Sequence, residues 1–173
     1  MSSRKENIII TALELFANEG YNATSTSKIA KQAEVSEGLI FRHFKNKQGL
    51  LNAVIAAADK RLKEVTAPLF ELKEPKEIIR FIIEMPFNID EDKHDFWRMQ
   101  FTIKWEQNYY KHDKMKPILE LLIVAFSQLG YPSPDKEAQL LLNIIEGIST
   151  DILRGTLVDS EAFRSFMLNK YEL

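Results

Sequence analysis

The stretch TSTSKIAKQAEVSEGLIFRHFKNKQGLL, residues 24–51, decides the fold. Residues 24–27, Ser36 and Asn46 are types that cap helix N-termini. Apolar residues recur at helical spacing between these caps, so the stretch predicts two short helices, a turn of about three residues between them, and the start of a further helix. The apolar positions that would form a small shared core are Ile29, Ala30, Ala33, Val35 and Ile40. This pattern predicts a helix–turn–helix, whose second helix enters the major groove of DNA in such motifs.

Helical patterns continue on both sides of this stretch. Upstream, apolar residues at helical spacing predict a helix over roughly 4–18, with Gly20 as its stop. Downstream, Pro75 fits a first helical turn and Pro86 ends or kinks that helix. Further helices are predicted over residues 47–65, 90–110, 115–129, 135–154 and 160–171. No run alternates with the period of a strand, so the predicted fold class is all-α with about nine helices.

Composition narrows the class of protein. The chain of 173 residues has no cysteine, which excludes disulfides and thiolate-bound metals and fits a reducing compartment. Its first residues are polar, and its apolar runs, such as Leu121–Phe126, are too short to cross a bilayer. Residues 1–64 carry 10 Lys and Arg against 7 Asp and Glu, whereas residues 65–173 carry 13 against 18. We therefore expect a cytoplasmic protein with no membrane contact and a mildly basic N-terminal head.

Together with ALELFANEGYNAT at residues 12–24, the opening stretch resembles the DNA-binding head of the TetR family of transcriptional repressors. The resemblance covers about residues 6–55. It implies a helix–turn–helix domain over 1–46 and a ligand-binding and dimerisation domain over 47–173, linked by the fourth helix. It also implies a homodimer on a palindromic operator in double-stranded DNA, released when a small-molecule effector binds. The implied function is a ligand-responsive transcriptional regulator, a repressor, with no enzymatic activity.

The resemblance carries over to individual positions of the second short helix and its surroundings. Gly38 would let the backbone approach DNA, Arg42 could offer a fork to guanine or phosphate, and His43 could donate to phosphate. The full set expected to contact DNA is Thr26, Ser36, Glu37, Gly38, Leu39, Phe41, Arg42, His43 and Lys47. Three positions depart from the family pattern, which favours glycine at 34, lysine at 37 and tyrosine at 41. Glu37 could accept from cytosine N4, or could serve only as a helix N-terminal charge.

Two features of the C-terminal part leave alternatives open. Trp97, Phe101 and Trp105 recur every four residues, either as core or as the lining of a pocket for a partly apolar effector. The helix over 135–154 is apolar on most of its circumference, which predicts burial on two sides, either against a second chain or wholly inside its own. The residues expected at the dimer interface are Leu141, Ile145, Ile148, Ile152, Phe163, Phe166 and Met167.

The sequence contains few motifs that would indicate another class of function. The three histidines His43, His94 and His112 are scattered, and no zinc-binding His pair, phosphate loop or cysteine nucleophile is present. No catalytic residue, metal or cofactor is expected. The alternative function is an all-helical protein–protein interaction or adaptor protein without DNA binding, but an adaptor does not explain Gly38, Arg42, His43 and Lys47 together.

Overall fold

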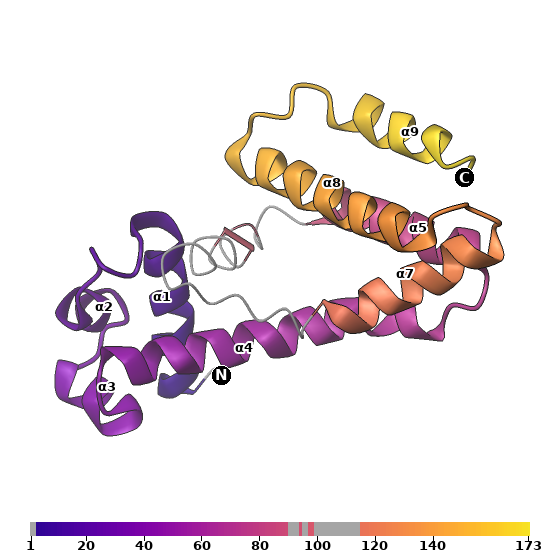
Figure 1. Cartoon of the computed structure of the whole chain (residues 1–173). Coiled ribbons are helices and arrows are strands. Elements are labelled where there is room, and N and C mark those ends of the chain that lie inside the picture. The colour runs from indigo at the N-terminus through magenta and orange to yellow at the C-terminus, as the bar shows by residue number, and fades with distance from the viewer. Residues whose placement is uncertain (1–2, 90–93, 95–96, 99–114) are drawn as a thin grey trace. The chain divides into compact units, whose positions relative to one another are not determined.

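The computed structural model describes residues 3–89, 94, 97–98 and 115–173 (Figure 1). Within these residues the chain forms eight α-helices and two short 3-10 helices and contains no strand, which confirms the predicted all-α class. The helices are α1 Arg4–Glu19, α2 Thr26–Gln32, α3 Glu37–Phe44, α4 Lys47–Thr66, η1 Ala67–Glu71, α5 Pro75–Glu84, η2 Met85–Asn88, α7 Lys116–Gln128, α8 Pro134–Arg154 and α9 Ser160–Lys170. The helix predicted over 90–110 lies outside the described residues, apart from residues 94, 97 and 98.

The chain divides into two compact units. Of the described residues, the N-terminal unit holds 3–65, 94 and 97–98, and the C-terminal unit holds 66–89 and 115–173. Most of α4 therefore belongs to the N-terminal unit, and its apolar face packs in that unit's core through Leu50, Leu51, Val54, Ile55 and Ala58. The domain boundary predicted after residue 46 stays a prediction.

The N-terminal unit packs α1 to α4 around one apolar core. α1 begins with a capping box, in which the Ser3 hydroxyl accepts from the Glu6 N–H and the Glu6 carboxylate accepts from the Ser3 N–H. Its inward face meets the residues that the sequence placed in the helix–turn–helix core. The fully or almost fully buried members of that core include Ile8, Ala12, Phe16, Ile29, Ala30, Ala33, Ile40 and Phe44. The predicted core of the motif is thus confirmed, with Val35 partly buried against it.

The turn between α2 and α3 puts a glutamate where a glycine is usual. The Val35 N–H donates to the Ala30 carbonyl at 2.9 Å and the Glu34 N–H to the Lys31 carbonyl at 3.3 Å, which is the pattern of a Schellman motif. Glu34 has φ 54°, inside the left-handed region that costs a residue with a Cβ free energy. The same motif ends α7 and α8 with Gly130 and Gly155. The helix–turn–helix therefore keeps its turn at Glu34 in spite of local strain.

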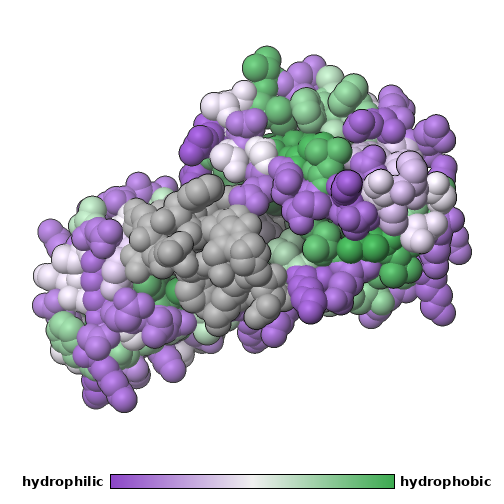
Figure 2. All heavy atoms as spheres, in the orientation of Figure 1, coloured by the Kyte–Doolittle hydropathy of each residue, from purple (hydrophilic) through white to green (hydrophobic). Residues whose placement is uncertain are grey.

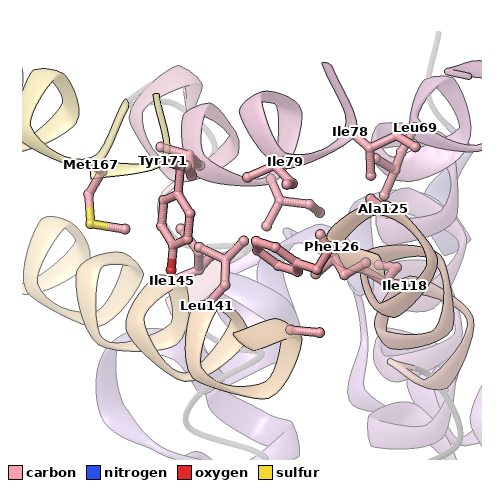
Figure 3. Packing of buried hydrophobic residues seen from close by; sticks show 14 of the residues in the cluster. Leu69, Ile78, Ile79, Ile118, Ala125, Phe126, Leu141, Ile145, Met167 and Tyr171 are labelled. Carbon is pink, nitrogen blue, oxygen red and sulfur yellow. The ribbon is translucent and has the colours of Figure 1, made fainter. Parts of the chain in front are cut away.

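The C-terminal unit is a helical bundle in which α7 packs against both α5 and α8, and α9 packs against α5. Prolines stand in the first turn of α5, α7 and α8, where the missing N–H leaves no bond unmade. The core draws apolar side chains from each of these helices and from η1 (Figure 3). Its central aromatic residue is Phe126, whose ring lies 4.9 Å from that of Tyr131 and 5.8 Å from that of Tyr171.

Tyr171 closes this core from the C-terminal end of the chain. It is 4% exposed, and Figure 3 shows its hydroxyl directed toward the side chains of α8. The hydroxyl has no hydrogen-bond partner among the described residues. Burial, with smaller contributions from Glu137 and Tyr131, raises the pKa of Tyr171 to about 12. Lys76 holds the neighbouring backbone, because its ammonium donates to the Glu172 carbonyl at 2.7 Å.

The surface differs between the units on the face that Figure 2 shows, where hydrophobic patches gather mainly on the C-terminal unit. None of the described helices is both long and apolar enough to cross a membrane.

Candidate nucleic-acid interface

Helix α3 is held by a cap at its start and by two buried side chains on one face. The Ser36 hydroxyl accepts from the Leu39 N–H at 3.3 Å, so the predicted cap is confirmed. Ile40 and Phe44, one turn apart, are 0% and 6% exposed, and Leu39 packs partly against the same core. These contacts fix the rotation of α3 about its axis and thereby decide which side chains point to solvent.

The solvent face of α3 is cationic with one aromatic side chain. Gly38 and Arg42, spaced one turn apart on α3, are exposed, as is Lys45, the residue that follows the helix; Phe41 is 44% exposed. No ion pair joins Arg42 or Lys45 to any residue in the described part of the chain. His43 is exposed at the edge of this face, with its ring 5.9 Å from that of Phe44. The helix and the residue after it thus present two cations whose charge is free to meet an anion.

Gly38 leaves open space in the middle of this face. A Cβ built on Gly38 would meet no atom within 4 Å, so the protein's own packing does not require a glycine here. Glycine in a helix costs roughly 0.5–1 kcal/mol relative to alanine. The open space fits the expectation that the glycine lets DNA come close to the backbone of α3.

Thr26 and Glu37, both predicted to contact DNA, are bonded to each other. The Thr26 hydroxyl donates to the Glu37 carboxylate at 2.6 Å, in a partly buried position. Thr26 opens α2 and Glu37 opens α3, so the bond joins the N-terminal ends of the two helices. One carboxylate oxygen is engaged, and the Thr26 proton is no longer free for a phosphate oxygen.

The N-terminus of α4 carries a fixed cation. The Lys47 ammonium lies 4.2 Å from the centre of the Tyr21 ring and 3.5 Å from the Asn22 carbonyl oxygen, to which it donates. The Tyr21 hydroxyl in turn donates to the Gln48 side-chain oxygen at 3.2 Å, and burial raises the pKa of Tyr21. Asn46 caps the helix by accepting from the Gly49 N–H at 2.7 Å. A positive charge and a helix N-terminus together favour an anion such as phosphate.

Sequence reasoning missed two residues in the link from α3 to α4. Lys45 adopts φ 69° and ψ −46° while the Asn46 N–H reaches back to the Phe44 carbonyl at 2.9 Å, which is the strained form of γ-turn. A Cβ on Gly49 would lie 1.9 Å from the Phe44 carbonyl oxygen, so only glycine fits without a shift. The sequence signal for this tight link is the short spacing between Phe44, which ends α3, and Gly49 in the first turn of α4.

The residues predicted at the dimer interface divide into two groups. Leu141, Ile145, Ile148 and Met167 are at most 5% exposed and belong to the core of the C-terminal unit. These four side chains pack inside their own unit, so their place at a dimer interface stays a prediction. Phe163 and Phe166 are 37% and 60% exposed with ring centres 6.0 Å apart, and Ile152 is half-buried. Leu140, which the prediction left out, is 46% exposed on α8.

The aromatic stripe cannot be placed as a set. Phe101 and Trp105 lie outside the described residues, and of the three only Trp97, half-buried, is described. Whether the stripe is pocket or core therefore stays a prediction.

Comparison with known proteins bears on the N-terminal unit most directly. A family model described as bacterial regulatory proteins, tetR family, matches residues 8–54. The HTH-type transcriptional regulator YvkB of Bacillus subtilis is 46% identical over 56 residues, 32% of this chain and 30% of that protein. YerO of the same organism, also an HTH-type transcriptional regulator, is 34% identical over 56% of this chain and 34% of its own length. The chain thus spans about a third of these curated relatives.

A solved structure matches almost the whole fold. The crystal structure of a transcriptional regulator from Saccharomonospora viridis in complex with choline has a TM-score of 0.80 and covers 97% of this chain and 95% of its own, at 19% sequence identity. At that identity the likeness establishes the helical architecture of both units and nothing about the ligand of this chain.

Proposed function

The chain belongs to the tetR family of bacterial regulatory proteins, and from this membership we propose that it represses transcription by binding a palindromic operator as a homodimer. A small molecule bound in the C-terminal unit would release the DNA. A location in the cytoplasm, where bacterial operators lie, is part of the same proposal.

The observation that carries the proposal is the free cationic face of α3. Arg42 is exposed one turn from the open backbone at Gly38, Lys45 is exposed directly after the helix, and neither has an ion-pair partner in the described ranges. In a helix–turn–helix this face is the one that enters the major groove. Arg42 is placed to offer its guanidinium fork to guanine, and Lys45 to meet a phosphate.

Lys47 would anchor the head on the DNA backbone. The Tyr21 ring and the Asn22 carbonyl hold its ammonium, and Lys47 is itself the first residue of α4. A prepositioned cation loses less side-chain entropy on binding than a freely rotating lysine. Phosphate contacts of this kind set the register of a protein on the duplex, and base contacts then supply the sequence preference.

Glu37 would reduce affinity for DNA in general while adding selectivity. Glu37 is the first residue of α3, the helix that would enter the groove. The hydrogen bond from the Thr26 hydroxyl holds its carboxylate in place. A fixed negative charge repels phosphate wherever it is not matched by a donor from a base edge such as cytosine N4.

The proposed dimer forms through α8 and α9. Leu140, Phe163 and Phe166 expose large apolar side chains on these helices, and Ile152 on α8 is half-buried. Exposed apolar side chains that gather on a protein surface often mark a contact with another protein. For the effector, the proposal is a partly apolar small molecule; the related Saccharomonospora protein was solved with choline.

The first experiment selects bound duplexes from a random DNA pool with the wild-type protein and then measures Kd against salt. We expect a palindromic consensus and affinity that falls steeply with salt. Arg42→Ala should weaken binding at least about fivefold per half-site, since a bidentate contact to a base contributes about 1–3 kcal/mol. Arg61→Ala is the matched control, because Arg61 lies on α4 and pairs with Glu64 at 3.5 Å. A folded Arg42→Ala protein that binds the consensus like the wild type would overturn the assignment of α3.

The second experiment measures the mass of the protein in solution by analytical ultracentrifugation. We expect a dimer at micromolar concentration that Phe166→Ser weakens. Val158→Ser is the control, because Val158 is fully exposed in the connection between α8 and α9. A wild-type monomer at that concentration, or equal weakening by both variants, contradicts the proposed interface.

A further inference from the structure

We propose that Phe41 recognises the C5-methyl group of a thymine in each operator half-site and thereby determines part of the sequence preference. The inference rests on the proposed function, since it names one feature of the DNA that the same helix face would read.

Phe41 lies among the exposed residues of α3. Its side chain is 44% exposed on α3, next to Arg42 in sequence, one turn after Gly38 and four residues before Lys45. The two cations draw this face toward DNA. Gly38 has no side chain to shield the ring, and the space around its missing Cβ is empty to at least 4 Å. A base edge brought up to α3 could therefore reach the rim of the ring.

The side chain of Phe41 is wholly apolar. A phenyl group has neither donor nor acceptor, so Phe41 cannot hydrogen-bond a phosphate oxygen or the nitrogen and oxygen atoms of a base edge. The major groove displays one apolar group, the C5-methyl of thymine, and side chains such as phenylalanine contact it there. Of the four bases, thymine alone matches what Phe41 can recognise.

The neighbours of Phe41 set it apart from another exposed phenylalanine. Phe70 is 50% exposed, but it lies on η1 of the C-terminal unit, between Leu69, which is buried, and Glu71, an anion. Phe70 has no adjacent cation in sequence, so DNA is not drawn to it. Phe70→Ala removes the same apolar group from a surface that the proposal does not involve and is the matched control.

The test exchanges single thymines of the selected operator for deoxyuridine, which lacks only the methyl group, at symmetry-related positions in both half-sites. Kd is measured by fluorescence anisotropy at constant salt. At one position the exchange should weaken wild-type binding about fourfold per half-site, the value for removing one buried methyl from contact. Phe70→Ala should show the same loss. Phe41→Ala should bind both duplexes equally, and Phe41→Leu, which keeps an apolar side chain, should show a smaller loss.

Two outcomes would overturn the inference. The first is a wild-type protein whose Kd is unchanged by deoxyuridine at every thymine of the operator. The second is a Phe41→Ala protein that loses as much as the wild type at the sensitive position, since another group would then contact the methyl. Both leave the proposed function standing, because both require specific binding to the thymine-containing operator; absence of that binding would instead refute the proposed function.

Discussion

The Tyr171 hydroxyl gives a stability prediction that can be worked out from the structure. Its ring fills the core beside Phe126, while its oxygen is buried with no hydrogen-bond partner among the described residues. Phenylalanine keeps the ring and removes the unsatisfied hydroxyl. Because leaving a buried polar group unpaired costs about 1–3 kcal/mol, Tyr171→Phe should raise the free energy of unfolding by about 1 kcal/mol at neutral pH.

Alkaline pH should enlarge this difference. The ordinary tyrosine pKa is 10.0, which applies to the unfolded chain, whereas the pKa of Tyr171 in the folded chain is about 12. The unfolded state therefore loses the proton first, so the stability present below pH 10 is lost as the pH rises through the window from 10 to 12. At pH 11 the wild-type protein should have lost about 1.4 kcal/mol relative to pH 8 from this group alone. The variant lacks the group, so its advantage should grow to about 2.4 kcal/mol.

The assay is urea unfolding of both proteins at pH 8 and pH 11, at one protein concentration, followed by far-ultraviolet circular dichroism. All other titrating groups are common to the two proteins and cancel in the difference to first order. A difference that stays constant between the two pH values would refute the reasoning, since the hydroxyl would then ionise alike in both states. A phenylalanine variant less stable than the wild type at pH 8 would show that the hydroxyl makes a favourable bond.

Three further predictions concern the head. Gly49→Ala should destabilise the protein by about 2 kcal/mol in thermal or urea unfolding, because the new Cβ would collide with the Phe44 carbonyl. The control is Gly38→Ala, where a Cβ meets open space. This variant should stabilise the protein by about 0.5–1 kcal/mol and weaken operator binding. Equal effects on stability would contradict this. Glu34→Gly should stabilise by about 1 kcal/mol, since φ 54° suits glycine, and an unchanged midpoint would show that the turn carries no strain. Glu37→Gln should tighten binding to random DNA and lower the preference for the operator over random DNA in gel-shift competition. An unchanged preference would show that Glu37 does not face the groove.

The sequence predicted the helices and the inner face of the head because these depend on short-range rules. Caps at Ser36 and Asn46 fix where α3 and α4 begin. Helical spacing then places Ile40 and Phe44 on one side, and both are buried. Such positions follow from the order of residues along one helix and need no knowledge of how helices cross.

Contacts between helices did not follow from the sequence in the same way. The bond from Thr26 to Glu37 joins residues eleven positions apart and depends on the crossing of α2 and α3. The cation of Lys47 over Tyr21 likewise spans the distance from the end of α1 to the start of α4. The sequence pattern indicates that each of these side chains faces outward. It does not indicate that two of them contact each other.

The sequence did not separate the buried from the exposed apolar residues of α8 for a related reason. Along α8, an apolar residue is consistent with the core of its own unit or with a partner chain, because both environments exclude water. Leu140 and Leu141 are adjacent and chemically identical, yet they are 46% and 0% exposed. One step along a helix rotates the side chain by about 100°, enough to move it from core to surface. Which of the two points inward depends on where α7 and η2 pack against α8, and this long-range information must come from the folded unit. The exposed set on α8 and α9 is therefore the better guide to where a second copy would bind.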